Sequence, residues 1–208
     1  MTMIAGGRTV HVVPNALDTR FPRPVGPRRP GRTPVIGYFG HLTDKWFDWK
    51  LVIAAAKRYP EFRFEMAGHQ QPNLNYPPNI ELLGLVGHAE LAERSRTWSV
   101  ALIPFKNGPP ADAVDPIKIY EYLHLRIPVL ASYFPQCRDY PGTTITEGTE
   151  EFLTKLGQLV GTELAEDEIA DWLSHNTWEQ RVDEYSALAE DVRRGARDNV
   201  MALVGGEL

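Results

Sequence analysis

The stretch DPIKIYEYL, residues 115–123, contains side chains whose types and spacing could bind an anionic ligand. Asp115 can cap a helix, and Pro116 suits the first helical position because its missing N–H costs no hydrogen bond there. The free backbone N–H groups of Ile117 and Lys118 would then face an anion that the helix dipole favours, and the Lys118 ammonium adds a full charge. Glu121 follows about one helical turn later, ~5 Å along the same side.

A carboxylate at position 121 could accept two hydroxyl hydrogen bonds while the helix end holds a phosphate group. A nucleoside diphosphate offers both features, because its ribose diol lies about one helical turn from its phosphates. A plainer interpretation is a surface ion pair between Lys118 and Glu121, worth a few tenths of a kcal/mol, with Asp115 only capping the helix. Taken alone, the motif slightly favours the plainer interpretation.

The elements that would position this motif alternate between strands and helices. The apolar runs predict strands at 35–40, 62–68, 79–87, 100–105, 127–132 and 143–146. Helical patterns lie between them, and three more helices are predicted at 150–160, 163–175 and 177–194. Repeated β-α alternation predicts an α/β fold with a Rossmann-like, doubly wound parallel sheet, followed by a helical C-terminal segment. In such a sheet the ligand lies beyond the carboxyl ends of the strands, where residues 115–123 are expected.

The first 34 residues differ in composition from the rest of the chain. Residues 9–13 predict a strand that has no evident partner, and residues 14–34 hold six prolines, five arginines and a single acidic residue. Because proline removes backbone donors and favours extended backbone, we expect a solvated linker, although its basic run could touch phosphate. We therefore divide the chain into an N-terminal strand and interdomain linker (1–34), a ligand-binding domain (35–175) and a C-terminal helix and tail (176–208).

Composition narrows the classes of function. The chain has 208 residues, 43% of them hydrophobic and 24% charged, which predicts a soluble globular domain. Its formal net charge of −5 argues against nucleic-acid binding, because phosphate contacts need clustered lysine and arginine. Cys137 is the only cysteine, so neither an internal disulfide nor a cysteine metal site is expected. With no apolar run near ~20 residues and no recognisable signal peptide, we expect a cytoplasmic location.

The order of motifs resembles the C-terminal, donor-binding domain of GT-B glycosyltransferases of family 4, also called glycosyl transferase group 1. VVPNALD resembles the family's segment between its two domains, with Ala16 where glycine is usual. GYFGHLTDKWFDWKL resembles its first strand and turn, DPIKIYEYLHLRIPVLAS its donor-binding helix and next strand, and HNTWEQRVDEY its closing helix. The resemblance covers nearly the whole chain and implies binding of a nucleotide-diphosphate sugar as substrate, without an essential metal and without a cofactor.

The resemblance also implies roles for particular residues. Glu121 matches the second glutamate of the family's Glu-x7-Glu motif, which binds the ribose hydroxyls. Lys118 matches the basic residue that contacts the diphosphate and stabilises it as leaving group. The loop after the first strand supplies another phosphate contact, which falls on Gly40 and on His41 or Lys45.

Two departures limit what can be transferred from the family. The first glutamate of the motif should stand at Ala113, where only Asp112 and Asp115 on either side could help hold a donor sugar. The sugar and the stereochemical outcome are therefore open. A GT-B enzyme also needs an N-terminal domain or partner subunit, which would carry the acceptor site and could bring peripheral membrane association, so we expect the isolated chain to transfer no sugar. A nucleotide-sugar epimerase of related fold and a non-catalytic interaction subunit are the alternatives.

The closing helix shows an apolar stripe. Trp178, Val182, Tyr185 and Leu188 recur at helical spacing and form one face. Since the family's final helix packs against the other domain, we expect partial exposure near Trp178 or Tyr185, and residues 14–34 not to be packed on the domain.

Overall fold

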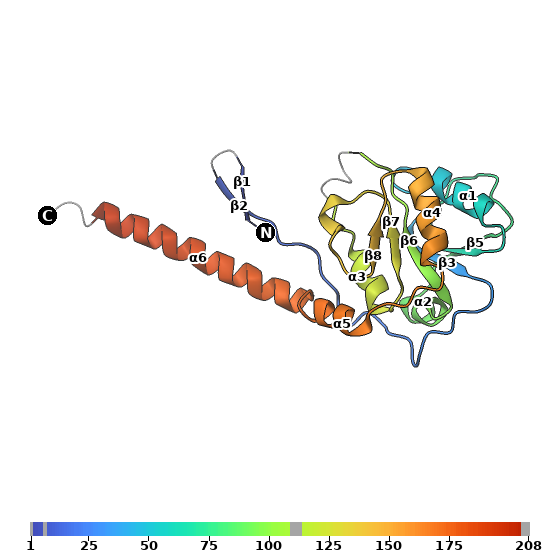
Figure 1. Cartoon of the computed structure of the whole chain (residues 1–208). Coiled ribbons are helices and arrows are strands. Elements are labelled where there is room, and N and C mark those ends of the chain that lie inside the picture. Colours follow the sequence, from blue (N-terminus) through green and yellow to red (C-terminus); the bar gives the residue numbers. More distant parts are fainter. Residues whose placement is uncertain (1, 6–7, 109–113, 205–208) are drawn as a thin grey trace.

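A computed structural model of the chain describes residues 2–5, 8–108 and 114–204. Its centre is a six-stranded sheet of order β5-β4-β3-β6-β7-β8, in which every neighbouring pair is parallel (Figure 1). The strands are β3 (Val35–His41), β4 (Arg63–His69), β5 (Ile80–Gly84), β6 (Trp98–Ile103), β7 (Val129–Ala131) and β8 (Thr143–Ile145). All six strands were predicted from the sequence, with ends that differ by a few residues.

Helices cover both faces of the sheet. One hydrophobic cluster joins the sheet to α1 (Trp49–Arg58) and α4 (Thr149–Leu159), and a second joins it to α2 (His88–Ser95), α3 (Ile117–His124) and α5 (Glu166–Ser174). The strand order runs outward in opposite directions from β3 and β6, so the sheet is doubly wound and its switch point lies between these two strands. The predicted fold class is confirmed.

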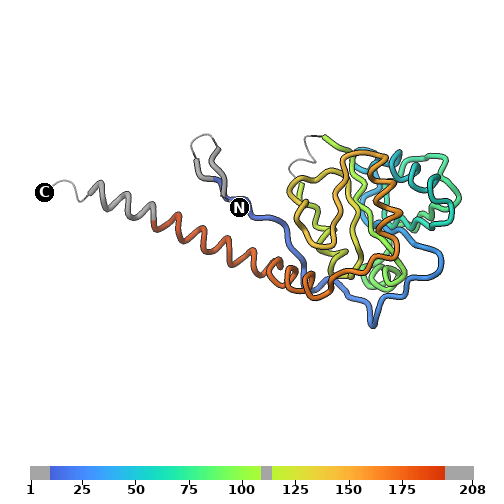
Figure 2. The backbone as a smooth tube through the Cα atoms, viewed as in Figure 1, coloured from blue at the N-terminus to red at the C-terminus, as the bar shows by residue number. Residues whose placement is uncertain are grey.

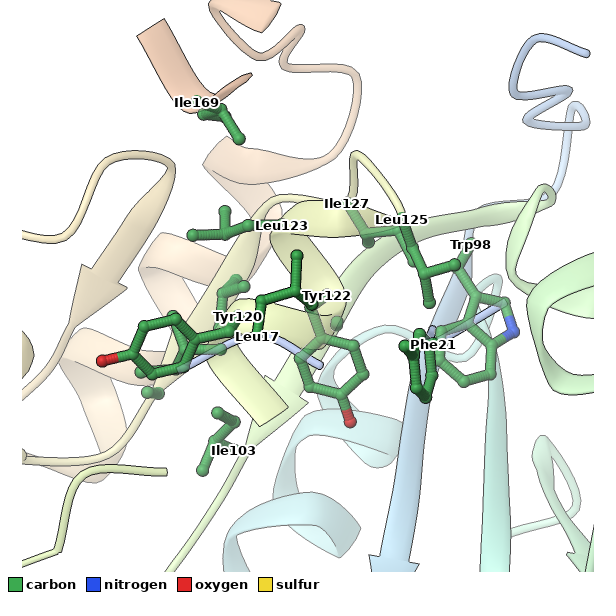
Figure 3. Packing of buried hydrophobic residues seen from close by; sticks show 14 of the residues in the cluster. Leu17, Phe21, Trp98, Ile103, Tyr120, Tyr122, Leu123, Leu125, Ile127 and Ile169 are labelled. Carbon is green, nitrogen blue, oxygen red and sulfur yellow. The ribbon is translucent and has the colours of Figure 1, made fainter. Parts of the chain in front are cut away.

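The N-terminal residues are more structured than predicted. The expected strand exists as β2 (Arg8–His11), but it has a partner, because it pairs in antiparallel register with β1 (Thr2–Ala5). Within 14–34 the side chains of Leu17 and Phe21 are buried in the same cluster as α3 (Figure 3). The ring of Phe21 stacks on that of Phe39, with ring centres 6.1 Å apart.

The prediction of a solvated linker is therefore wrong at Ala16, Leu17 and Phe21, which are buried, whereas most of residues 23–33 are exposed. Proline prevents sheet pairing but does not prevent side-chain burial, and arginine can donate to exposed carbonyl groups. Arg28 shows the second effect, because its guanidinium donates to the backbone oxygen of Trp98. We call this segment, residues 14–34, which runs along the domain (Figure 1), the strap.

The long helix α6 (Trp178–Val204) leaves the domain beside this strap (Figures 1 and 2). At its start, the backbone of Leu17 donates to Asn176 at 2.9 Å and accepts from Trp178 at 3.1 Å. The apolar face is partly exposed as predicted, with Trp178 37%, Val182 61% and Tyr185 57% exposed. No helix in the described part of the chain is long and apolar enough to cross a membrane.

Candidate functional site

A pocket of about 280 Å³ opens beside the switch point, at the carboxyl ends of β3 and β4. It is closed on one side by the start of α3 and on another by the start of α2. The residues that line it include Phe39, Gly40, His41, Gly68, His69, Leu85, Val86, His88, Ile117, Lys118 and Glu121. Five residues predicted as donor-binding from the sequence therefore converge on one pocket: Gly40, His41, Ile117, Lys118 and Glu121.

The helix that carries Lys118 and Glu121 is anchored by its other faces. Ile119, Tyr120, Tyr122 and Leu123 are fully buried against the sheet and the strap. The anchoring leaves Lys118 and Glu121 half-buried on the pocket side, and no ion pair joins them. The plainer interpretation, an exposed Lys118–Glu121 surface pair, is therefore wrong.

The two charges of the pocket are poorly solvated. Among the described residues, neither the Lys118 ammonium nor the Glu121 carboxylate takes part in a hydrogen bond. Burial raises the pKa of Glu121 to about 7, against the opposing effect of the Lys118 charge, and Asp18 raises it slightly further. Burial likewise lowers the pKa of Lys118, while Glu121 opposes that shift. Charged groups without partners in a pocket are suited to pair with groups of a ligand.

Gly40 makes room for the Lys118 side chain. A Cβ at this position would lie 2.4 Å from Lys118 Cε and 2.9 Å from the Tyr38 hydroxyl. The backbone of Gly40 also has a φ of +140°, which side chains rarely adopt. A glycine at the end of β3 thus lets the ammonium of α3 reach the switch point of the sheet.

Lys45 does not join this pocket. It lines a separate, mainly apolar cavity of about 420 Å³ with Trp46, Phe105 and Phe134, and its ammonium lies 5.0 Å from the centre of the Trp46 ring. His41 and Lys45 were the two candidate phosphate contacts in the loop after the first strand. Only His41 lines the pocket that contains Lys118 and Glu121. Among the described residues that line the 420 Å³ cavity, no carboxylate is present that could bind a diol.

The prediction that Asp115 caps the helix is wrong, while its predicted role in donor binding stays a prediction. Helix α3 begins at Ile117 with Pro116 as its N-cap, one residue later than predicted, and no side chain caps it. The Asp115 carboxylate instead accepts from the backbone N–H of Asn15 at 2.7 Å and from the Tyr120 hydroxyl at 2.9 Å. It does not line the pocket. Asp112 and Ala113 lie outside the described residues.

Sequence reasoning missed His69 and His88, which line the pocket from β4 and from the start of α2. Neither has a second histidine nearby in the sequence, so spacing gave no signal. The informative signal was position, because His69 stands at the carboxyl end of a predicted strand, where ligands of doubly wound sheets bind. No group of three or more His, Cys, Asp or Glu side chains in the described part of the chain is arranged to hold a metal ion.

Comparisons with known proteins agree with this fold. No family model matches the chain. The "Putative teichuronic acid biosynthesis glycosyltransferase TuaH" of Bacillus subtilis (strain 168) is 26% identical over 148 residues, covering 64% of this chain and 36% of that protein. The chain thus spans little more than a third of the curated relative it matches.

Solved structures with a similar fold include a synthase and two transferases. Sucrose-phosphate synthase from Thermosynechococcus elongatus superposes with a TM-score of 0.63 at 13% identity, over 80% of this chain and 47% of that one. The lipopolysaccharide outer core galactosyltransferase WaaB in its apo form superposes with a TM-score of 0.62 at 14% identity, over 83% of this chain and 53% of that one. The pneumococcal O-GlcNAc transferase GtfA, in complex with UDP and GlcNAc, superposes with a TM-score of 0.56 at 14% identity, over 85% of this chain and 38% of that one.

The fold and the position of the pocket define a Rossmann-like domain of the kind found in GT-B glycosyltransferases. The resemblance recognised in the sequence is confirmed at this level by the curated relative and by the solved structures. Membership of family 4 stays a prediction.

Proposed function

We propose that this chain is the donor-binding part of a glycosyltransferase and binds a nucleotide-diphosphate sugar in the pocket between β3, β4 and α3. The observation that carries the proposal is the half-buried pair Lys118 and Glu121, which has no hydrogen-bond partners among the described residues and lies at the switch point. One group suits a diphosphate and the other a ribose diol, at the separation that one helical turn sets. GtfA, a structure of similar fold, is described in complex with UDP.

In this proposal each residue has a defined chemical role. The Glu121 carboxylate accepts hydrogen bonds from the two ribose hydroxyls and so orients the nucleotide. The Lys118 ammonium and the free N–H groups at the start of α3 lie against the diphosphate. As the glycosidic bond to the donor phosphate breaks, negative charge grows on the leaving oxygen, and the fixed positive charge stabilises it. Half-burial strengthens this effect because less water screens the charges.

The acceptor site belongs, in this proposal, to an N-terminal domain or to a partner subunit. Because the chain spans 47% of sucrose-phosphate synthase and 53% of WaaB, it corresponds to about one half of such an enzyme. The isolated 208-residue chain should therefore bind donor but transfer no sugar. Acceptor-dependent transfer by the purified chain would contradict this part of the proposal.

The proposal can be tested by calorimetric titration with UDP-glucose, GDP-mannose and ADP-glucose. The wild-type chain should bind at least one of them. Glu121→Ala should weaken that binding by about 1–3 kcal/mol, the scale of charge-assisted hydrogen bonds. Lys118→Met should weaken the binding of the nucleotide sugar to a similar degree. It should leave the binding of the bare nucleoside unchanged, because the nucleoside has no phosphate.

A matched control is Glu168→Ala, which removes an exposed carboxylate from α5, away from the pocket. This variant should bind as the wild type does. Equal affinity of Glu121→Ala and wild type would show that the nucleotide, if it binds, does not use this pocket. Absence of binding by all three nucleotide sugars would favour the non-catalytic interaction subunit.

A further inference from the structure

Two histidines stand side by side at the mouth of the pocket. His41 ends β3, His69 ends β4, and the two residues are partners in the parallel register of these strands. Their ring centres lie 4.8 Å apart with an angle of 67° between the planes. Both line the pocket together with Lys118.

Neither imidazole has a hydrogen-bond partner among the described residues. His41 is exposed and His69 is half-buried, so water can reach both rings and a ligand can displace that water. An imidazole at this position can donate to an oxygen anion from either ring nitrogen when protonated. The two rings therefore line the same pocket as Lys118 and have no hydrogen bond to another described residue.

We propose that His69, acting as a pair with His41, is a second diphosphate-binding residue, and that proton uptake by this pair makes donor binding stronger as pH falls. The inference rests on the proposed function, because it assumes that a diphosphate occupies the pocket. It adds a residue that lies outside the helix motif, on β4, and a pH response that the His69→Gln and His41→Gln variants separate from any titration of Lys118.

The direction of the effect follows from the charges that face the pair. The ionisable groups lining the pocket are His41, His69, His88, Lys118 and Glu121. A bound diphosphate would place negative charge beside the two rings, so binding would raise their affinity for protons. By linkage, affinity for the diphosphate must then rise as pH falls through the histidine range.

Protonation of Glu121 has the opposite effect on nucleotide binding, so the experiment must separate it from the effect of the histidines. Its carboxylate form accepts the ribose hydroxyl hydrogen bonds, so protonation of Glu121 at lower pH weakens nucleotide binding. The experiment is therefore run both in the wild type and in a Glu121→Gln background, where the carboxylate is absent. Nucleotide sugars are the suitable probes because the phosphates of their diphosphate diester carry no proton that titrates near neutrality.

The test is calorimetric titration with UDP-glucose, GDP-mannose and ADP-glucose between about pH 6 and 8. In the Glu121→Gln background, affinity should rise by up to about sixfold as pH falls across this range, the effect over these two pH units of a tenfold higher proton affinity of one imidazole in the complex. Titrations in two buffers of different ionisation enthalpy should show net proton uptake. His69→Gln and His41→Gln, on separate strands, should each reduce the pH dependence of the affinity and the proton uptake.

The control is His175→Gln, which removes an exposed histidine after α5 and should keep the full pH dependence. If a nucleotide sugar binds but its affinity is independent of pH, or if His69→Gln and His41→Gln both keep the wild-type pH dependence, the histidine proposal is wrong while the proposed function stands. If none of the three probes binds at any pH, the proposed function and this inference are both overturned.

Discussion

The backbone N–H of Asn15 donates to the Asp115 carboxylate at 2.7 Å, joining residues that are 100 positions apart in the chain. The carbonyl oxygen of Asn15 accepts from the Arg181 guanidinium at 3.4 Å, and that guanidinium also donates to the Pro14 oxygen at 3.1 Å. Asn15 of the strap thus forms hydrogen bonds both with Asp115, near the start of α3, and with Arg181, near the start of α6. Asp115, two residues before the start of α3, therefore holds that helix to the strap, and the strap in turn holds the start of α6.

Asp115→Ala should destabilise the fold by about 2–4 kcal/mol, because it leaves the Asn15 N–H and the Tyr120 hydroxyl without their acceptor. Urea denaturation measures the loss. Asp139→Ala, at an exposed position between β7 and β8, is the control and should change the free energy of unfolding by less than about 0.5 kcal/mol. Equal stability of the two variants would show that the Asn15–Asp115 contact contributes nothing.

Glu121→Gln should stabilise the chain above neutral pH. Burial raises the pKa of Glu121 from 4.5 to about 7, so the folded state binds this proton more tightly than the unfolded state does. The resulting stability is fully present below the unfolded pKa and is lost as pH rises towards 7. Near pH 8 the ionised carboxylate therefore costs roughly 1–3 kcal/mol, which the neutral glutamine removes.

The measurement for Glu121→Gln is urea denaturation of wild type and variant near pH 5 and near pH 8. The gain in stability should be small at the lower pH and clear at the higher one. Glu168→Gln, at an exposed position on α5, should show the same stability as wild type at both. A gain that does not grow with pH would mean that burial of the Glu121 charge is not its cause.

Gly40→Ala should weaken nucleotide binding by about 1–3 kcal/mol, as expected for Lys118→Met, because the new Cβ would lie 2.4 Å from Lys118 Cε and displace the ammonium. Its backbone strain should also cost about 1–3 kcal/mol of stability. Gly84→Ala is a matched control, since Gly84 has a φ of +68° and no atom lies within 4 Å of the position that a Cβ would take there. Gly84→Ala should lose stability but keep its affinity for the nucleotide sugar in calorimetry, and equal affinity loss in both variants would argue against displacement.

The exposed face of α6 should make the isolated chain self-associate, because contiguous exposed apolar side chains favour contact with another surface. The double variant Trp178→Ser with Tyr185→Ser should shift sedimentation-velocity profiles towards monomer. Val25→Ser, which removes an 87% exposed side chain on the strap, should leave the profiles unchanged. A wild-type chain that sediments as a monomer at high concentration would contradict the prediction.

The sequence by itself determined the fold class and the helix that carries Lys118 and Glu121. Alternation of apolar strands with helical patterns is a local property, and in a doubly wound sheet it places the helix after β6 at the ligand-binding edge. The order of motifs was enough to recognise the relationship to GT-B glycosyltransferases. The exposed face of α6 was likewise readable from the spacing of Trp178, Val182 and Tyr185.

Tertiary structure alone decided what depends on contacts between distant residues. The partner of Asp115 is Asn15, and no local pattern indicates a bond across 100 positions, so sequence reasoning assigned Asp115 to the helix cap. The packing of Leu17 and Phe21 was missed because proline content describes backbone freedom and says nothing of side-chain burial. His69 joins His41 only through the register of β3 and β4, and strand register is set by the sheet as a whole.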